Sequence, residues 1–381
     1  MISNIFQPVL QSLVKIDAVA VAPIRATLTN PFPIASDASK VDRIDNVIVR
    51  IKTAEGILGY GEAAPYYGIS GDLQQSVLAD VHTIVPELRW TYFDAFTLET
   101  MLRRMRFSSS RAAVEMAFLD ALSKRAQVPL TQVLHPAAHQ AVLSTDITIP
   151  LLPKEIGARL AHQYAQDGFR RWKIKVGNGV VIDFDRIIAV AEATHSIGAF
   201  TYLVDANEGY SVRDAIELIR RLAEQHLAPQ IFEQPVRRED VAGLKKVRSG
   251  IREFGTAVFA DEAVYTAADA ERLAAENAVD GFNLKIMKHG GLLEALRIAA
   301  IARRNSLNLM IGGMVETRLA MTASLHLAHA IGNISWLDLD TPYLLSEDSF
   351  SGGLRYQPPS LYLPSGHGIG VGVNPNLIFE N

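Results

Sequence analysis

The first third of the chain opens with a β pattern. Residues 15–25 alternate apolar and polar side chains as a half-buried strand does. Two further β-rich runs, residues 45–53 and 57–63, flank the turn Ala54-Glu55-Gly56, which predicts a hairpin.

From about residue 72 to residue 134 the pattern becomes helical. Within residues 110–126, apolar side chains recur at i, i+3, i+4 and i+7, at Val114, Ala117, Phe118 and Ala121. The serines at 108–110 are the expected cap of this helix.

From about residue 140 short β-rich runs alternate with helix-length amphipathic stretches. No hairpin signal separates the runs, so the pattern favours a parallel sheet. Eight such units predict an α/β fold, a (β/α) TIM-type barrel, modified in its first or last unit. A doubly wound sheet is the alternative, but no Gly-rich phosphate motif follows the first run. The predicted strands are 143–149, 171–176, 201–205, 230–233, 257–260, 281–285, 308–312 and 335–338.

These patterns divide the chain into two predicted domains. Residues 1–139, completed by 345–381, form an α+β capping domain, because the Gly- and Pro-rich tail is expected to pack back on the first module. Residues 140–344 form the barrel.

Composition restricts the function classes. The 381 residues carry a net charge of -4 and imply no basic face, so nucleic acid is not an expected partner. Cysteine is absent, which excludes disulfides, thiolate metal sites and a cysteine nucleophile. We expect no signal peptide and no membrane span, and predict a cytoplasmic protein.

Charged residues stand where the predicted barrel strands end, and barrel enzymes place their catalytic groups there. Lys173 and Lys175 share one face of a strand, because side chains alternate with period two. Further strands end in three acids spaced 28 residues apart and then in a lysine: Asp205, Glu233, Asp261 and Lys285.

Three converging carboxylates repel one another unless a cation lies among them. Oxygen ligands suit Mg²⁺, or Mn²⁺, better than zinc. Buried lysines near such a cation should have a lowered pKa, and a neutral lysine can act as a base. The metal would hold a substrate carboxylate and stabilise the enediolate formed when the α-proton leaves.

Taken in order, the motifs resemble the muconate-lactonizing subgroup of the enolase superfamily, over nearly the whole chain. Each motif alone would be weak evidence. They are KIK at 173–175, VDAN at 204–207, FEQP at 232–235, ADE at 260–262, NLKIMKHGG at 283–291, GGMVET at 312–317, GYGEAAP at 59–65 and RAAVEMAFLDA at 111–121.

The resemblance implies a role for each residue of this constellation. It implies Asp205, Glu233 and Asp261 as Mg²⁺ ligands. It implies Lys175 and Lys285 as acid/base catalysts on opposite faces of the substrate, with Lys173 supporting the site.

The segment LDLDTP at 337–342 resembles the Asp-x-Asp signature of dipeptide epimerases. There Asp338 and Asp340 would hold the ammonium of a dipeptide, and two carboxylates at period two make a suitable trap. Thr148, in TDITI, and ISGD at 69–72 also resemble the epimerase versions. The implied reaction is inversion of the α-carbon of the second residue of an L,L-dipeptide.

One loop departs from the pattern of Ala-Glu epimerases, which resemble one another in an arginine there. Residues 30–42 carry Ser36 and Asp37 around the matching place and no arginine. We therefore expect Asp37 to disfavour an acidic second residue and a hydrophobic or cationic one to be accepted. This loop and residues 66–72 are expected to close over the substrate.

Plainer interpretations and competitors stand beside this hypothesis. Asn207, Glu262 and Glu316 are expected to orient the lysines or the metal. Lys288 is expected to neutralise an acid, and His289 to be an ordinary loop histidine.

The competing functions are an N-acylamino acid racemase, an o-succinylbenzoate synthase or a muconate-type cycloisomerase of the same subgroup. A water-eliminating lyase and a non-catalytic metal-binding scaffold remain as well. The resemblance also implies a homo-oligomer.

Overall fold

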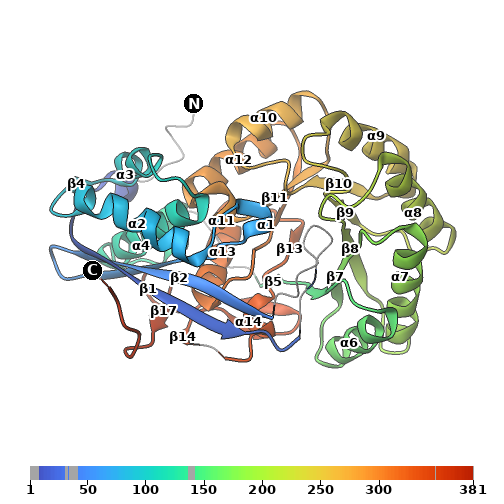
Figure 1. Cartoon of the computed structure of the whole chain (residues 1–381), viewed down its shortest axis with the longest axis horizontal. Helices are drawn as coiled ribbons and strands as arrows, with labels where there is room; N and C mark the ends of the chain where they lie inside the picture. Colours follow the sequence, from blue (N-terminus) through green and yellow to red (C-terminus); the bar gives the residue numbers. More distant parts are fainter. Residues whose placement is uncertain (1–7, 31–32, 34–41, 136–141, 348, 381) are drawn as a thin grey trace.

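The computed structural model describes residues 8–30, 33, 42–135, 142–347 and 349–380. Figure 1 shows two parts side by side, a mixed part containing both chain ends and a ring of strands surrounded by helices. None of the described helices has the length and apolar character needed to cross a membrane.

The first part is built on an antiparallel sheet of order β3-β2-β1-β4. The predicted hairpin is confirmed as β2 and β3, and the first predicted strand as β1. The strands are β1 (Val14–Thr27), β2 (Arg43–Thr53), β3 (Leu58–Ala63) and β4 (Tyr92–Phe93).

Among the described residues, five helices and one 3₁₀ turn complete this part. The predicted helical region is confirmed, and α4 packs so closely on β3 that a side chain on Gly59 or Gly61 would overlap the helix backbone. The elements are η1 (Pro8–Gln11), α1 (Tyr67–Ser70), α2 (Gln74–Leu88), α3 (Ala95–Leu102), α4 (Ser108–Arg125) and α5 (Leu130–Leu134).

The predicted serine cap of α4 is wrong. The helix begins at Ser108, and the next two serines are buried within it. The carboxylate of Asp80 instead accepts the N–H groups of Arg106 and Phe107, each at 3.0 Å, just before the helix. A capping group from another helix leaves no signal at the local spacing used for the prediction.

The second part contains the eight predicted strands as one parallel sheet in chain order, so the α/β barrel prediction is confirmed. The N–H of Asp146 donates to the carbonyl of Leu337 at 2.9 Å and joins the first strand region to the last. The strands are β6 (Ile147–Ile149), β7 (Arg171–Lys175), β8 (Thr201–Asp205), β9 (Ile231–Glu233), β10 (Ala257–Ala260), β11 (Gly281–Leu284), β12 (Asn308–Ile311) and β13 (Trp336–Leu337).

The first predicted strand, residues 143–149, is wrong as one element. Its start forms β5 (Leu143–Ser144), which pairs with β16 (Ser360–Tyr362) outside the barrel, and only β6 enters the barrel. The outer and connecting helices are α6 (Lys154–Gln166), α7 (Val180–Thr194), α8 (Val212–Glu224), α9 (Val241–Ile251), η2 (Arg252–Phe254), α10 (Ala267–Ala275), α11 (Ile286–His289), α12 (Leu292–Arg304), α13 (Arg318–Ile331) and α14 (Thr341–Leu344).

The tail returns to both parts. It contains β14 (Phe350–Gly352), β15 (Arg355–Gln357), β16 and β17 (Val371–Val373). The N–H of Ile369 donates to Asp120 of α4 at 2.8 Å, and Glu380 bridges to Val21 of β1. The division into residues 1–139 plus 345–381 and residues 140–344 stays a prediction.

An apolar layer lies inside the barrel. Phe259 and Trp336 belong to a small separate core, and each precedes an inward-facing acid by two residues. Because side chains alternate along a strand, these apolar residues form a layer inside the barrel beneath the polar residues at the strand ends. The other members are Leu203, Ile231 and Met310.

Two glutamates of the first part bind the starts of barrel helices. Glu62 on β3 accepts the N–H groups of Thr317 at 2.9 Å and Ala320 at 3.1 Å, where α13 begins. Glu115 on α4 accepts the N–H of Leu293 at 3.1 Å, at the start of α12. The first N–H groups of a helix have no partner within the helix, so these hydrogen bonds satisfy them and hold the first part against the barrel.

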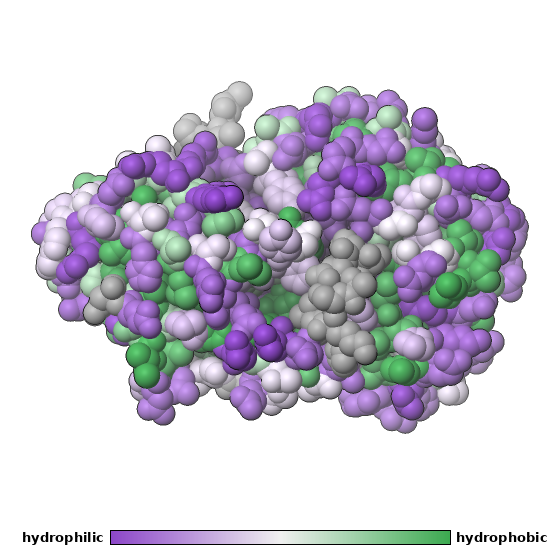
Figure 2. Space-filling model, viewed as in Figure 1, coloured by the Kyte–Doolittle hydropathy of each residue, from purple (hydrophilic) through white to green (hydrophobic). Residues whose placement is uncertain are grey.

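Polar side chains cover most of the visible face, and apolar ones gather only in small patches (Figure 2). Charged side chains are instead buried at the strand ends, where barrel enzymes carry their catalytic groups.

Candidate active site

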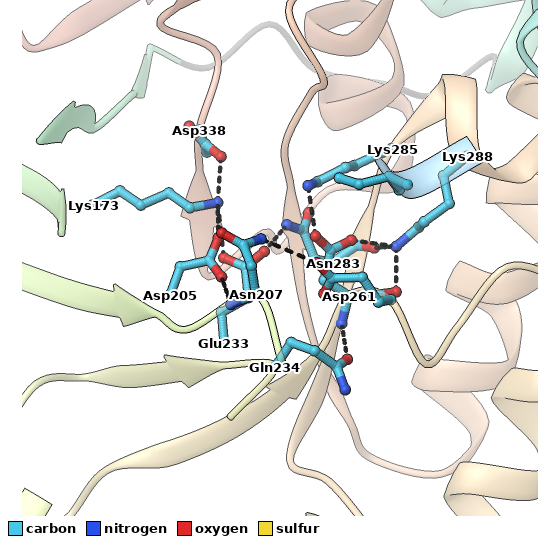
Figure 3. A network of polar contacts seen from close by, with 12 residues as sticks. Lys173, Asp205, Asn207, Glu233, Gln234, Asp261, Asn283, Lys285, Lys288 and Asp338 are labelled. Atoms are coloured by element: carbon cyan, nitrogen blue, oxygen red, sulfur yellow. Dashed lines mark hydrogen bonds and ion pairs between the residues drawn. The ribbon is translucent and has the colours of Figure 1, made fainter. Parts of the chain in front are cut away.

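Three acids lie together at the carboxyl ends of β8, β9 and β10. The register pairs Lys175 with Asp205 and Asp205 with Glu233, so these side chains stand at one level of the barrel. Asp261 follows β10 directly, and all three acids are fully buried. The sequence placed these acids on adjacent strands, and the structure brings them to one site (Figure 3).

Lys173 lies between several carboxylates. Its Nζ is 3.0 Å from Asp205, 2.9 Å from Glu233 and 2.8 Å from Asp338. This buried ammonium therefore bridges the strand-end acids and the acid that follows β13 (Figure 3). The sequence assigned Lys173 a supporting position, but not this bridge.

Lys175, on the same strand, reaches one of these acids, Asp205. Its Nζ donates to Asp205 at 2.7 Å and to the amide oxygen of Asn207 at 3.0 Å. Asn207 in turn donates to Glu262 at 3.0 Å. Asn207 thus holds Lys175, and Glu262 holds Asn207 in turn.

Asp261 is held by two lysines on the other side. Lys285 donates to one of its oxygens and Lys288 to the other, each at 2.6 Å. Lys288 also donates to the carbonyl of Asn283 at 3.0 Å, and it is fully enclosed. The expected pairing of Lys288 with an acid is present.

The neighbouring carboxylates raise the pKa of two of these lysines, whereas the predicted lowering concerns lysines beside a bound cation and stays a prediction. Burial lowers the pKa of Lys285, but attraction to Asp261, Glu233 and Glu262 together outweighs burial and leaves that pKa raised. The pKa of Lys173 is also raised, because Asp338, Glu233 and Asp205 together outweigh its burial. The prediction counted the charge of a cation, whereas the direct contacts here are with carboxylates.

The pKa values of the neighbouring carboxylates shift in different directions. Burial, followed by repulsion from Asp205, raises the pKa of Glu233 to about 7. Burial and Asp261 raise the pKa of Glu262 to about 8. Burial alone would raise the pKa of Asp205, but the nearby ammonium groups, chiefly those of Lys175 and Lys173, lower it to about 2.

A second acidic group lies where β6 and β13 meet. Among the described residues, Asp146, Asp338 and Asp340 offer oxygens that all lie within 4.8 Å of one another, and all three side chains are buried. Asp340 accepts the N–H of Thr148 at 2.7 Å. Burial and Asp338 raise the pKa of Asp340 to about 7.

A pocket lies between three lysines of the strand ends and two acids of the second group, Asp338 and Asp340. It is lined by both predicted catalytic lysines and by both acids of the Asp-x-Asp segment, so a molecule in it can meet all four. The lining residues are Thr148, Lys173, Lys175, Lys285, Gly313, Met314, Asp338, Asp340 and Thr341.

The remaining predicted residues have different places. Glu316 is buried beside Gly313, and burial raises its pKa to about 8. His289 is buried at the end of α11, where its Nδ1 lies 2.8 Å from the carbonyl of Tyr265 and burial lowers its pKa to about 3. Asp37 lies outside the described residues.

Three polar residues of the site were missed. Asn283 donates to Glu233 at 2.6 Å, and it stands two residues before Lys285 on the same face. Asp146 likewise stands two residues before Thr148. Because side chains two residues apart share a face of a strand, this alternation could have predicted both residues. Gln234 accepts the N–H groups of Asp261 and Ala263, each at 3.0 Å, and its backbone φ of 33° gave no sequence signal.

The strand-end acids fit a hard divalent cation. Asp205, Glu233 and Asp261 offer only oxygen ligands, which suit such an ion, and Glu233 Oε2 is paired with the Lys173 ammonium at 2.9 Å. A cation there would also relieve the repulsion that raises the pKa of Glu233.

Comparison with known proteins agrees with this arrangement. Residues 15–134 match the family model described as mandelate racemase / muconate lactonizing enzyme, N-terminal domain. Residues 156–377 match the model described as enolase C-terminal domain-like.

Relatives at about one third identity cover nearly the whole chain. The L-Ala-D/L-Glu epimerase of Bacillus subtilis is 34% identical over 94% of this chain and 96% of that protein. The hydrophobic dipeptide epimerase of Citrifermentans bemidjiense is 34% identical over 95% of this chain and 98% of that protein. The dipeptide epimerase of Enterococcus faecalis, complexed with Mg and L-Leu-L-Tyr, has a TM-score of 0.87 at 33% identity, covering 94% of this chain and 99% of that one.

Proposed function

Because the chain belongs to the mandelate racemase / muconate lactonizing enzyme family, we propose that it is a Mg²⁺-dependent dipeptide epimerase. The protein is an isomerase that acts on amino-acid derivatives, as its epimerase relatives are. The proposed reaction inverts the α-carbon of the second residue of an L,L-dipeptide.

The observation that carries the proposal is the shared pocket. Lys175 and Lys285 line it together with Asp338 and Asp340, so it offers two acid/base groups and a place for an ammonium. A zwitterionic dipeptide matches this division of charge, with its carboxylate among the lysines and its amine among the acids. An N-acylamino acid has no ammonium to place there.

We assign the cation to Asp205, Glu233 and Asp261. These acids contact Lys173, Lys175 and Lys285, so a cation among them lies beside both proposed catalysts. Asp146, Asp338 and Asp340 contact only Lys173 in the ion pairs of the described residues, and they are better placed for the substrate amine. When bound, Mg²⁺ supplies positive charge beside the substrate carboxylate and stabilises the enediolate.

The two lysines carry the proton transfers. One Nζ removes the α-proton from one face, and the other returns a proton to the opposite face. Lys175 is held by Asp205 and Asn207, and Lys285 by Asp261, so the two ammonium groups approach from different strands. A neutral lysine is needed as the base, and a cation bound to Asp261 would weaken the attraction that now raises the pKa of Lys285.

We further propose a hydrophobic or cationic second residue. No arginine is present among the described residues that line the pocket, and Met314 contributes an apolar side chain. The relative named for hydrophobic dipeptides is as similar as the one named for L-Ala-D/L-Glu. The expected homo-oligomeric state and cytoplasmic location stay predictions.

Deuterium incorporation tests the proposal. The protein is incubated with Mg²⁺ and a library of L,L-dipeptides in D₂O, and mass and optical rotation are followed. A gain of one mass unit (about 1 Da per exchanged α-proton) with inversion at the second residue is expected. Exchange of N-acylamino acids with none of any dipeptide would overturn it, and fastest turnover of Ala-Glu would overturn the side-chain preference.

A further inference from the structure

A buried arginine lies behind Lys175, outside the pocket. Arg186 is on α7 and is only 5% exposed. Its guanidinium donates to three backbone carbonyls, those of Lys175 at 2.8 Å, Leu152 at 2.8 Å and Pro150 at 2.7 Å. It therefore ties the end of β7 to the chain that follows β6.

Asp183 completes this arrangement one turn earlier on α7. Its carboxylate accepts from Arg186 at 3.0 Å and from the N–H groups of Gly177 and Asn178, each at 2.8 Å. The hydroxyl of Tyr210 also donates to it. Two of the three residues that follow Lys175 are thus held by a carboxylate that is fully buried, and Arg186 holds Lys175 itself.

The Lys285 side has a different support. The carbonyl of Lys285 accepts the N–H of His289 at 3.1 Å within α11, and Lys288 holds the neighbouring Asp261. Arg186 makes its contacts with the β6 and β7 ends, so its influence falls on one of the two proposed catalysts. A planar guanidinium binds several carbonyls in a fixed geometry, which a lysine cannot reproduce.

We propose that Arg186, held by Asp183, is a positioning residue that sets the backbone of Lys175 and thereby governs proton transfer on one face of the substrate only. The inference rests on the proposed function, because it needs two lysines that act on opposite faces. A displacement of about 1 Å in a reacting group can cost about 100-fold in rate.

The test separates the two faces. Epimerisation must slow equally in both directions, because the equilibrium constant is fixed, but exchange of the α-proton with D₂O need not. The ratio of initial exchange rates starting from each epimer is measured for wild type, Lys175→Arg and Lys285→Arg, which fixes the direction that belongs to each lysine. Arg186→Lys is expected to shift this ratio by about 10- to 100-fold in the direction of Lys175→Arg.

Matched variants keep the test decisive. Arg248→Lys is the control, because Arg248 also binds one carboxylate and one carbonyl, those of Asp280 at 2.7 Å and Asn277 at 3.0 Å, before β11 begins. It is expected to leave the ratio unchanged. Tyr210→Phe removes one hydrogen bond to Asp183. It is expected to shift the exchange ratio in the same direction as Arg186→Lys but by a smaller factor. This variant replaces Arg186→Lys in the test if Arg186→Lys does not fold.

An unchanged exchange ratio in Arg186→Lys would overturn the inference, and so would a shift in the Lys285→Arg direction. If Arg186→Lys does not fold, the same outcomes in Tyr210→Phe would overturn it. Absence of any dipeptide exchange by the wild-type protein would instead overturn the proposed function. The two failures are therefore distinguishable.

Discussion

Two groups of three buried carboxylates lie in the barrel, and their surroundings differ. Asp205, Glu233 and Asp261 meet the ammonium groups of Lys173, Lys175, Lys285 and Lys288. In the ion pairs of the described residues, the group of Asp146, Asp338 and Asp340 meets only Lys173, and Asp146 Oδ1 has no hydrogen-bond partner.

The difference shows what each group lacks. The first group has abundant positive charge, which suits a site that must bind an anionic carboxylate and stabilise a more highly charged enediolate. The second group carries more negative than positive charge in a buried place, which is costly until a cationic group arrives. A dipeptide supplies one charge of each sign, so the comparison itself favours this substrate class.

The largest expected effect comes from removing a lysine of the first group. Lys285→Ala should lower kcat by about 10²- to 10⁴-fold, because the proton donor or acceptor of one face is lost. Lys245→Ala, on an exposed position of α9, should leave kcat unchanged. Steady-state kinetics with the best dipeptide measures both, and full activity of Lys285→Ala would remove this lysine from the chemistry.

Metal binding distinguishes the two groups next. Glu233→Gln should weaken Mg²⁺ binding by about 100-fold or more, because a direct ligand loses its charge. Asp340→Asn should keep most of the affinity. Titration calorimetry of the chelator-treated proteins measures both, and the reverse order would place the cation in the group of Asp146, Asp338 and Asp340.

Neutralising the second group should act on substrate binding. Asp340→Asn should raise KM for a dipeptide by about 10- to 100-fold, because a charge-assisted hydrogen bond to the ammonium is weakened. The affinity for an analogue that lacks the amino group should change little. Equal losses for the dipeptide and the analogue would argue against an ammonium site.

The smallest effect concerns stability, and it checks how burial acts where no lysine makes a direct contact. Burial, followed by Glu99, raises the pKa of Glu115 to about 8. The raised pKa means that the folded state binds this proton more tightly than the unfolded chain does. Its contribution to stability is fully present below the pKa of this carboxyl in the unfolded chain, and it is lost as the pH rises towards about 8.

Glu115→Gln should therefore be more stable than wild type at pH of about 9 and nearly equal to it at pH of about 5. Urea unfolding at both pH values measures the difference. A difference independent of pH would mean that the ionised carboxylate is not destabilised at this position.

Much of this arrangement was predictable from the sequence, because strand ends and period two are local properties. Asp205, Glu233 and Asp261 each end a recognisable β-rich run, and the parallel register then places them together. The alternation of Lys173 and Lys175 was sufficient to place both lysines inside the barrel.

Contacts between distant segments were not predictable in this way. The bridge of Lys173 to Asp338 depends on how the last strand closes against the first. The separation of β5 from β6 depends on a partner strand more than 200 residues away, since Ser144 pairs with Ser360. The raised pKa of Lys285 depends on its distance from Asp261, which spacing along the chain does not give.

The two glutamates that bind the starts of α12 and α13 bear on protein engineering. Glu62 and Glu115 reach across to backbone N–H groups of the barrel, so their targets persist whatever side chains the barrel carries there. A chimera that joins this first part to the barrel of another family member would keep its docking angle wherever these two helices begin at the same places. The first part and the barrel could then be exchanged between family members as separate modules, provided that these helix starts are aligned.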